Sequence, residues 1–134
     1  MYKKILVPLA LDHGHGFKAM EVARKLRAEG GEIIALHVVE AVPSFARYYV
    51  TENPGEEIRD AAEKELAERI GEAKDADITV LEGHPGRTIT DYAVEIGADC
   101  IVAGSHKREL QDFFLGSTAA RIVRHAPCSV HVLR

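Results

Sequence analysis

Residues 3–40 read KKILVPLALDHGHGFKAMEVARKLRAEGGEIIALHVVE, and their pattern indicates the fold class. Two nearly continuous apolar runs, Ile5–Leu9 and Glu32–Val39, are typical of parallel strands covered on both faces. Between them lies a stripe at the spacing of an amphipathic helix, with Gly30-Gly31 as its predicted end; the stripe is Ala19, Val22, Ala23 and Leu26. Strand, helix and strand in this order form a β-α-β unit.

The same alternation continues to the end of the chain. Three further strands are predicted at Ile78–Glu82, Asp99–Ala103 and Ser129–Leu133. An apolar stripe precedes each of them, and Gly97 and Pro127 are the predicted ends of the last two helices. The stripes are Ile58, Ala62, Leu66 and Ile70, then Ile89, Ala93 and Ile96, then Ala119, Ile122, Val123 and Ala126. Right-handed crossovers then predict an α/β fold with a doubly wound parallel sheet, in one domain over residues 1–134.

Composition narrows the classes of partner and the compartment. The formal net charge of −4 and the lack of long basic runs disfavour nucleic acid or an anionic membrane as the main partner. No apolar run reaches the roughly 18 residues of a membrane span, and the N-terminus lacks a signal-peptide pattern. Cys100 and Cys128 lie in apolar contexts without the spacing of a zinc site, which predicts buried, inert thiols and a cytoplasmic location.

Residues 41–55, AVPSFARYYVTENPG, do not fit the alternation, because their aromatic residues show no clean periodicity. The segment is predicted as a loop or short helix over the mouth of the sheet. Two interpretations stay open: a connection whose aromatic side chains pack on the core, or a lid over a ligand or partner site.

The residues that follow the fourth strand are the strongest candidates for a binding site. In an open doubly wound sheet, ligands bind beyond the carboxyl ends of the strands, where the chain order reverses. Gly104 permits close approach of a ligand, and Gly116-Ser117-Thr118 begins a helix with unpaired backbone N–H groups. Lys107 and Arg108 add positive charge nearby. The stretch is either a phosphate site or a loop in which Gly-Ser only caps the helix.

Residues 102–134, VAGSHKRELQDFFLGSTAARIVRHAPCSVHVLR, resemble the C-terminal signature of nucleotide-binding universal stress proteins. In that signature two spaced glycines precede a Gly-Ser or Gly-Thr pair. The stretches KKILVPL, LHVVE and EGHPGRTITDYA also occur in the family's order, so the resemblance extends over the whole chain.

The resemblance implies a five-stranded parallel sheet in the order 3-2-1-4-5 with helices on both faces. It also implies an adenine nucleotide, ATP or AMP with magnesium optional, across the switch point between the first and fourth strands. Pro8 and Val38 would flank the adenine, and Gly104 would lie under the ribose or first phosphate. The phosphates would be lined by Lys107, Gly116, Ser117 and Thr118, with His106 and Arg108 as further candidates.

The resemblance also bears on assembly, because relatives commonly dimerise through the last strand. That strand lies at an edge in the implied order, and its apolar residues need covering. We therefore expect a homodimer through residues 128–134.

Two positions depart from the family's pattern. Ala10 stands where an aspartate is usual, which removes one ribose or adenine contact unless Asp12 substitutes for it. Lys107 replaces the second glycine, and the loop from there to Gly116 is shorter than usual. These changes bear on the number of phosphates bound and on affinity.

The remaining histidines are assigned structural or solvent-exposed roles. His13 and His15, in the sequence HGHG, are predicted to lie in a polar loop rather than to form a metal pair. His37 and His131 fall within strands and His125 near a helix end, so hydrogen-bonded structural roles are expected.

No catalytic or metal-binding residue is predicted. The sequence has no GxxxxGK[ST] loop, and no nucleophile or carboxylate pair at an informative spacing. The predicted function is therefore that of an adenine-nucleotide-binding stress-response or regulatory module, and not of an enzyme. The alternatives are a slow ATPase of the same fold and a flavodoxin- or receiver-like signalling protein. The receiver alternative is the poorer one. A receiver needs acidic residues after the first strand, an aspartate at the end of the third and a lysine after the fifth, and this chain has Ala10, Glu82 and Arg134 near those places.

Overall fold

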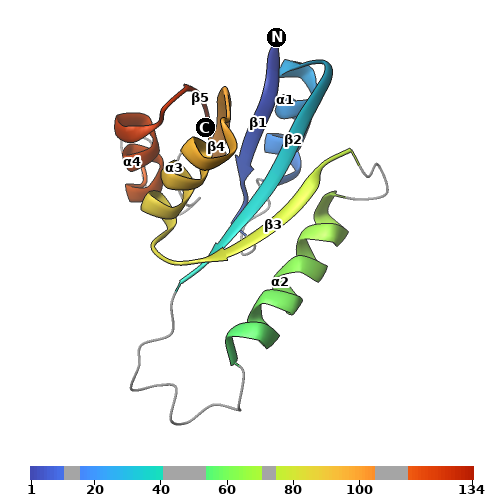
Figure 1. The fold of residues 1–134 in the computed structure, drawn as a ribbon, viewed down its shortest axis with the longest axis vertical. Coiled ribbons are helices and arrows are strands. Elements are labelled where there is room, and N and C mark those ends of the chain that lie inside the picture. The colour runs from blue at the N-terminus through green and yellow to red at the C-terminus, as the bar shows by residue number, and fades with distance from the viewer. Residues whose placement is uncertain (11–15, 41–53, 71–74, 105–114) are drawn as a thin grey trace.

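The computed structural model describes residues 1–10, 16–40, 54–70, 75–104 and 115–134 (Figure 1). Strands and helices alternate within these ranges, as the sequence predicts. The strands are β1 (Tyr2–Pro8), β2 (Arg27–Val39), β3 (Asp77–Glu82), β4 (Cys100–Gly104) and β5 (Ser129–Leu133). The helices are α1 (Gly16–Leu26), α2 (Pro54–Ile70), α3 (Pro85–Ile96) and α4 (Ser117–His125).

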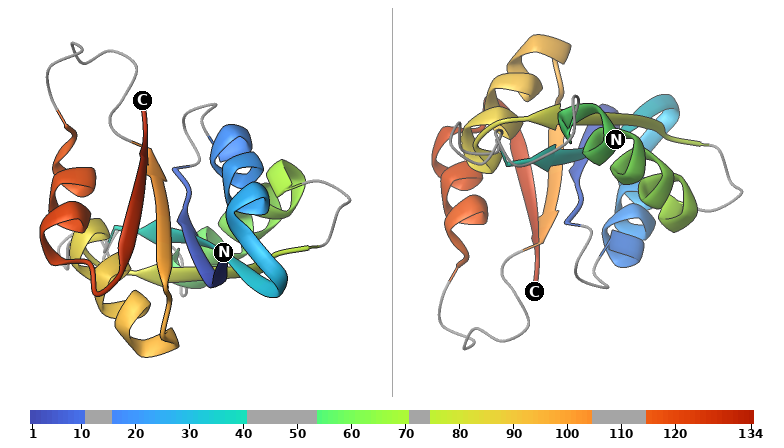
Figure 2. Two further views of the ribbon diagram at one scale, coloured as in Figure 1. Left: turned by 90° about the horizontal axis from the view of Figure 1, so that it is seen from above. Right: turned by 90° about the horizontal axis from the view of Figure 1, so that it is seen from below.

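The strands form one five-stranded sheet in the order β3-β2-β1-β4-β5, and each neighbouring pair is parallel. This order confirms the expectation from the family resemblance. Helices α1 and α2 pack on one face of the sheet, and α3 and α4 pack on the other (Figure 2). None of the helices in the described ranges combines the length and the apolar character needed to cross a membrane.

The core consists of two apolar layers separated by the sheet. Successive side chains of a strand point to opposite faces, so one strand supplies both layers. In β1, Ile5 and Val7 join the layer under α1 and α2, whereas Leu6 joins the layer under α3 and α4. All three are fully buried. The apolar run in this strand is therefore explained by helices on both sides.

The predicted end of the first helix is wrong. Helix α1 ends at Leu26, and β2 begins directly afterwards at Arg27, so Gly30-Gly31 lies inside the strand. The pairing register with β1 shifts between Tyr2 and Lys4, and Gly30 takes a φ of +75° in this irregular part. Glycine adopts that backbone conformation without steric cost, so here it serves an irregular part of the strand rather than a helix end.

Helix α2 is less buried than its predicted stripe suggests. Ala62, Leu66 and Ile70 are buried, but Ile58 is 39% exposed. The segment 41–55 was predicted as a loop or short helix; residues 41–53 lie outside the described part, and Pro54-Gly55 are the first residues of α2.

The two cysteines differ in burial, which corrects half of that prediction. Cys100 is 1% exposed, and burial raises the pKa of its thiol to about 11. Cys128 is only half-buried, because it directly precedes β5, the edge strand with a neighbour on one side alone. Burial also raises the pKa of Cys128, so both thiols stay protonated near neutral pH.

Asp99 joins the amino ends of β1 and β4. Its carboxylate accepts hydrogen bonds from the backbone N–H groups of Lys3 at 2.8 Å and Lys4 at 3.0 Å. Its own N–H donates to the Lys4 carbonyl at 3.0 Å. Burial acts to raise the pKa of Asp99, but the two backbone donors prevail and lower it below the usual value. The folded state is therefore stabilised by the ionised form.

We predict that Asp99→Asn lowers the free energy of unfolding at pH 7 by about 1–2 kcal/mol, because one charged acceptor is lost. The pKa is lower in the folded state, so the contribution is complete above the unfolded-state pKa of about 4. It disappears as the pH falls below that value. Urea titrations of both proteins between pH 7 and pH 3 measure this, and a difference that does not depend on pH would contradict it.

Candidate nucleotide site at the carboxyl edge of the sheet

The carboxyl ends of all five strands meet at one edge, because every strand is parallel. β1 and β4 are neighbours at the centre, paired through Ile5 with Cys100 and Leu6 with Ile101. From the edge, β1 leads to α1 on one face, whereas β4 leads to α4 on the opposite face (Figure 2). The chain therefore leaves these two neighbouring strands in opposite directions, and the space beyond them is the switch point where such sheets bind ligands.

The chain beyond β1 is held by two hydrogen bonds to β2. The Leu9 N–H donates to the Leu36 carbonyl at 2.8 Å. The ring of His37 contacts the Leu9 carbonyl through Nδ1, also at 2.8 Å. A carbonyl only accepts, so Nδ1 carries the proton and donates. The predicted hydrogen-bonded role of His37 is confirmed. Both contacts hold the backbone at Leu9, which lies between the half-buried Pro8 and the exposed Ala10.

The start of α4 offers unpaired backbone donors. The first helical bond runs from the Ala120 N–H to the Gly116 carbonyl at 2.8 Å, so the N–H groups of Ser117, Thr118 and Ala119 have no partner inside the helix. They stand at the positive end of the helix dipole. An anion at this position would accept hydrogen bonds from the backbone itself.

The interpretation of Ser117 as the helix cap is wrong. Gly116 is the N-cap residue, with φ −57° and ψ 155°, and no side chain caps the helix. Ser117 is the first residue inside the helix. Its hydroxyl therefore has no capping role, which removes the simplest structural explanation for a serine at this position.

The structure assigns most of the predicted contact residues to this one edge. Four of them lie within two residues of the carboxyl end of a strand, and three lie at the start of α4; they are Pro8, Ala10, Val38 and Gly104, then Gly116, Ser117 and Thr118. Gly104 is exposed, and a side chain added there would meet no atom within 4 Å. Packing of the described residues thus leaves the space beside it open. His106, Lys107 and Arg108, and also Asp12, His13 and His15, lie outside the described residues.

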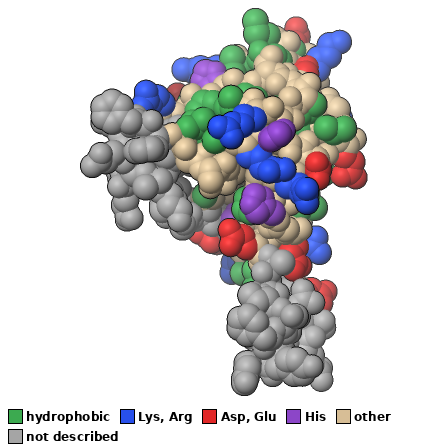
Figure 3. Space-filling view, turned by 90° about the vertical axis from the view of Figure 1, so that its left-hand side faces the viewer, with side chains coloured by type: hydrophobic (Ala, Val, Ile, Leu, Met, Phe, Trp, Pro, Cys, Tyr) green, Lys and Arg blue, Asp and Glu red, His purple; other side chains and the backbone are tan. Residues whose placement is uncertain are grey.

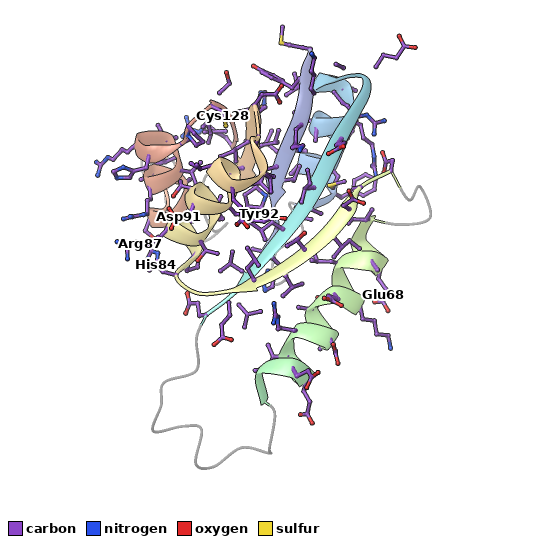
Figure 4. The ribbon with its side chains drawn as sticks, viewed as in Figure 1. Glu68, His84, Arg87, Asp91, Tyr92 and Cys128 are labelled. Carbon is purple, nitrogen blue, oxygen red and sulfur yellow. The ribbon has the colours of Figure 1, made fainter. Side chains whose placement is uncertain are left out.

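Sequence reasoning missed a second helix start at the same edge. Helix α3 follows β3, and its N-cap residue is His84, whose Nδ1 accepts from the Arg87 N–H at 3.4 Å (Figure 4). The signal was present as a polar residue followed by Pro85 at the first helical position. Gly83 precedes it with φ +151°, and its N–H donates to the Val39 carbonyl at 2.9 Å.

The ionisable groups with shifted pKa values belong to the opposite, amino edge. The guanidinium of Arg24 donates hydrogen bonds to both carboxylate oxygens of Asp75, from Nε at 2.7 Å and from Nη2 at 3.0 Å. This hydrogen bonding lowers the pKa of Asp75 and raises that of Arg24. Asp75 precedes β3 as Asp99 precedes β4, so both carboxylates stabilise the amino ends of strands. In the described ranges no three His, Cys, Asp or Glu residues form a group suited to a metal ion.

Comparisons with known proteins by sequence and by structure lead to the same family. The sequence model of the universal stress protein family matches residues 1–134. A universal stress protein of Thermus aquaticus is 32% identical over 140 residues, which covers all of both chains. The solved universal stress protein UspA of Lactobacillus plantarum has 24% sequence identity and a TM-score of 0.75, covering 99% of this chain and 98% of that one.

Two other solved universal stress proteins of the same fold contain a nucleotide. One was solved in complex with cAMP, with 20% identity, a TM-score of 0.71 and coverage of 99% of this chain and 97% of that one. The other, from Archaeoglobus fulgidus, was solved in complex with dAMP, with 20% identity, a TM-score of 0.62 and coverage of 99% and 98%.

We predict that His37→Phe lowers the free energy of unfolding by about 1 kcal/mol, since the Leu9 carbonyl loses its side-chain donor. The matched control is His125→Phe, at an exposed position at the end of α4. Thermal and denaturant unfolding of both variants measure the effect. An equal loss in the two proteins would show that the contact to Leu9 contributes nothing specific.

Proposed function

The chain belongs to the universal stress protein family, and on this premise we propose that it binds an adenine nucleotide at the switch point between β1 and β4. The observation that carries the proposal is the start of α4, whose first N–H groups have no partner inside the helix and stand at the same edge as Gly104. The cAMP and dAMP complexes of two proteins with this fold support an adenine nucleotide as the ligand class. The module then acts in stress response or regulation, in the cytoplasm.

The residues present fit the two halves of such a ligand. Pro8 and Val38 are half-buried and apolar, which suits the faces of a base. Gly104 and the N–H groups that follow Gly116 suit the ribose and phosphates. We expect His106, Lys107 and Arg108, outside the described residues, to add charge and donors to the phosphates, whether the ligand is ATP or AMP. A magnesium ion would arrive with the nucleotide.

Ala10 changes one contact within this proposal. Its methyl side chain accepts no hydrogen bond, so an acidic contact to ribose or adenine at this place is lost. Asp12 is the nearest acidic residue in the sequence that can replace it. We therefore expect more of the free energy of nucleotide binding to come from contacts to the phosphates, where the donors are backbone N–H groups.

We expect binding rather than turnover at this edge. Catalytic acids and bases usually have pKa values shifted by their site, and the described groups with shifted values lie at the amino edge instead. A slow ATPase is the second candidate. A measured release of phosphate that scales with protein concentration, and that Gly116→Val abolishes, would favour it.

We predict that the protein binds ATP or AMP in preference to GTP or flavin mononucleotide. Titration calorimetry with each ligand at millimolar concentration tests this, together with chromatographic identification of any nucleotide released from heat-denatured protein. No heat with ATP, ADP or AMP would overturn the proposed function. A yellow purified protein would instead favour the flavodoxin-like alternative.

We predict that Ser117→Ala leaves the free energy of unfolding within about 0.5 kcal/mol of wild type, because this residue is not the cap. Its affinity for nucleotide falls about five- to thirty-fold, if the hydroxyl donates to a phosphate. Gly116→Val is the stronger test. Its φ of −57° is open to any residue, so the change blocks the phosphates without backbone strain. Two folded variants that bind as tightly as wild type would place the phosphates elsewhere.

We also propose a homodimer through residues 128–134. β5 is an edge strand, paired with β4 on one side only within the described sheet. Its apolar residues Val130, Val132 and Leu133 are only half-buried. A second copy related by a two-fold axis would pair with this edge and cover both the backbone groups and these side chains.

We predict that light scattering gives the mass of a dimer, and that His131→Asp raises its dissociation constant. The exposed residue 131 lies in the middle of β5, so a two-fold axis brings the added negative charges of both copies close together. His125→Asp, an identical change at the end of α4, is the control and should leave the mass unchanged. A wild-type monomer at every concentration would refute the dimer.

A further inference from the structure

Five basic residues lie on, or directly before, the two neighbouring helices α3 and α4, and we call them the basic stripe: His84, Arg87, Arg121, Arg124 and His125. All are exposed except Arg121, which is half-buried. Figure 3 shows this side of the molecule, where Lys or Arg and His side chains form a band with the acidic ones mainly at its margins. Figure 4 labels His84 and Arg87 at the start of α3.

The two helices of the stripe are held in close contact. A side chain added at Gly86 would come within 2.6 Å of Cδ of Arg121, so the Arg121 side chain lies directly on the first turn of α3. Arg87 is the next residue along that turn. The Arg121 side chain of α4 therefore lies on the same turn of α3 that carries Arg87.

Helix electrostatics explain only part of the stripe. Arg124 and His125 occupy the last turn of α4, where positive charge is favourable. Arg87 occupies the first turn of α3, where the positive end of the dipole disfavours a cation. Arg121 also has a buried Nε with no hydrogen-bond partner among the described residues. Neither of these two arginines is explained by the helix that carries it.

Four other cations of the described chain have carboxylate partners, in contrast to the arginines of the stripe. Arg24 and Arg27 pair with Asp75, Lys4 pairs with Glu32, and Lys25 pairs with Glu21. Within the described residues, no ion pair involves the three arginines of the stripe. Asp91 stands one turn from Arg87 on α3 (Figure 4), and no ion pair joins these two residues. Three arginines without an ion pair among the described residues, in a chain of net charge −4, suit an anionic partner outside the chain.

We propose that the basic stripe docks an acidic polypeptide segment of another protein. Two apolar side chains on the same helices select this partner over a nucleic acid: Val94 on α3 is 64% exposed and Val123 on α4 is 50% exposed. A polypeptide with carboxylates and apolar residues on one face covers both kinds of side chain. Arginine binds carboxylates through two parallel hydrogen bonds. This geometry adds directional specificity to the attraction between opposite charges.

The test measures binding of the full chain to a fluorescent synthetic peptide of glutamate and leucine arranged as an amphipathic helix. Fluorescence anisotropy at low and at physiological salt gives the affinities. The variant Arg87→Gln/Arg121→Gln/Arg124→Gln should weaken binding by about ten-fold or more. The control Lys3→Gln/Lys18→Gln/Lys64→Gln removes the same charge from other surfaces and should stay within about two-fold of wild type.

The double variant Arg87→Gln/Arg124→Gln leaves Arg121 packed on Gly86, so it tests the stripe even if the triple variant is unstable. It should show an intermediate loss of affinity, with an unchanged melting temperature. Three results overturn the proposal: no binding by the wild type, an equal loss in the lysine control, or tighter binding of oligothymidylate than of the peptide. The last would identify the stripe as a site for nucleic acid.

Discussion

Burial of β1 on both faces is the constraint on which the arrangement of the molecule depends. Ile5, Leu6 and Val7 have no exposed surface, and they alternate between the two apolar layers. A strand in this position needs a strand on each side and a helix layer on each face. Right-handed crossovers then send the chain away from β1 and β4 in opposite directions, which opens the sheet at their carboxyl ends. The position of the candidate site thus follows from the way the helices cover both faces of the sheet.

The two edges of the sheet differ in their polar interactions. At the amino edge, carboxylates satisfy backbone and guanidinium donors, as Asp99 does for Lys3 and Lys4 and Asp75 does for Arg24. Their lowered pKa values show that the folded state uses the ionised forms. At the carboxyl edge, the start of α4 keeps donors unpaired within the helix. One edge is therefore built for stability, and the other retains the polar groups that a ligand requires.

Helix α4 belongs to both proposals made for this protein. Its first residues form the proposed phosphate end of the nucleotide site, and its second half carries Arg121 and Arg124 of the basic stripe. A ligand at one end and a partner along the side would both contact the same short, rigid element. This is the arrangement expected of a binding module whose role is to present a surface to other proteins, since neither proposal needs a catalytic group.

The sequence by itself determined the elements and the residues of the candidate site. Local periodicity gave the strands and helices, and Gly97 ends α3 in the left-handed conformation that its position predicted. The chain pattern also predicted that Gly104 and Gly116 would follow the fourth strand; Gly104 is the last residue of β4, and Gly116 lies beyond it. These inferences succeed because they depend on neighbours in the chain, and because parallel strands must end together at one edge.

Only the tertiary structure decided what depends on distant contacts. Gly30 lies where the register against β1 shifts rather than at a helix end, because the register between two strands is set across the sheet. Ser117 is not a cap, because the helix begins at Ser117 itself, one residue earlier than a cap at that position requires. The position of Arg121 on Gly86 follows from the packing of two helices far apart in sequence. No periodicity records such a contact, since it arises only when the second face of the sheet is covered.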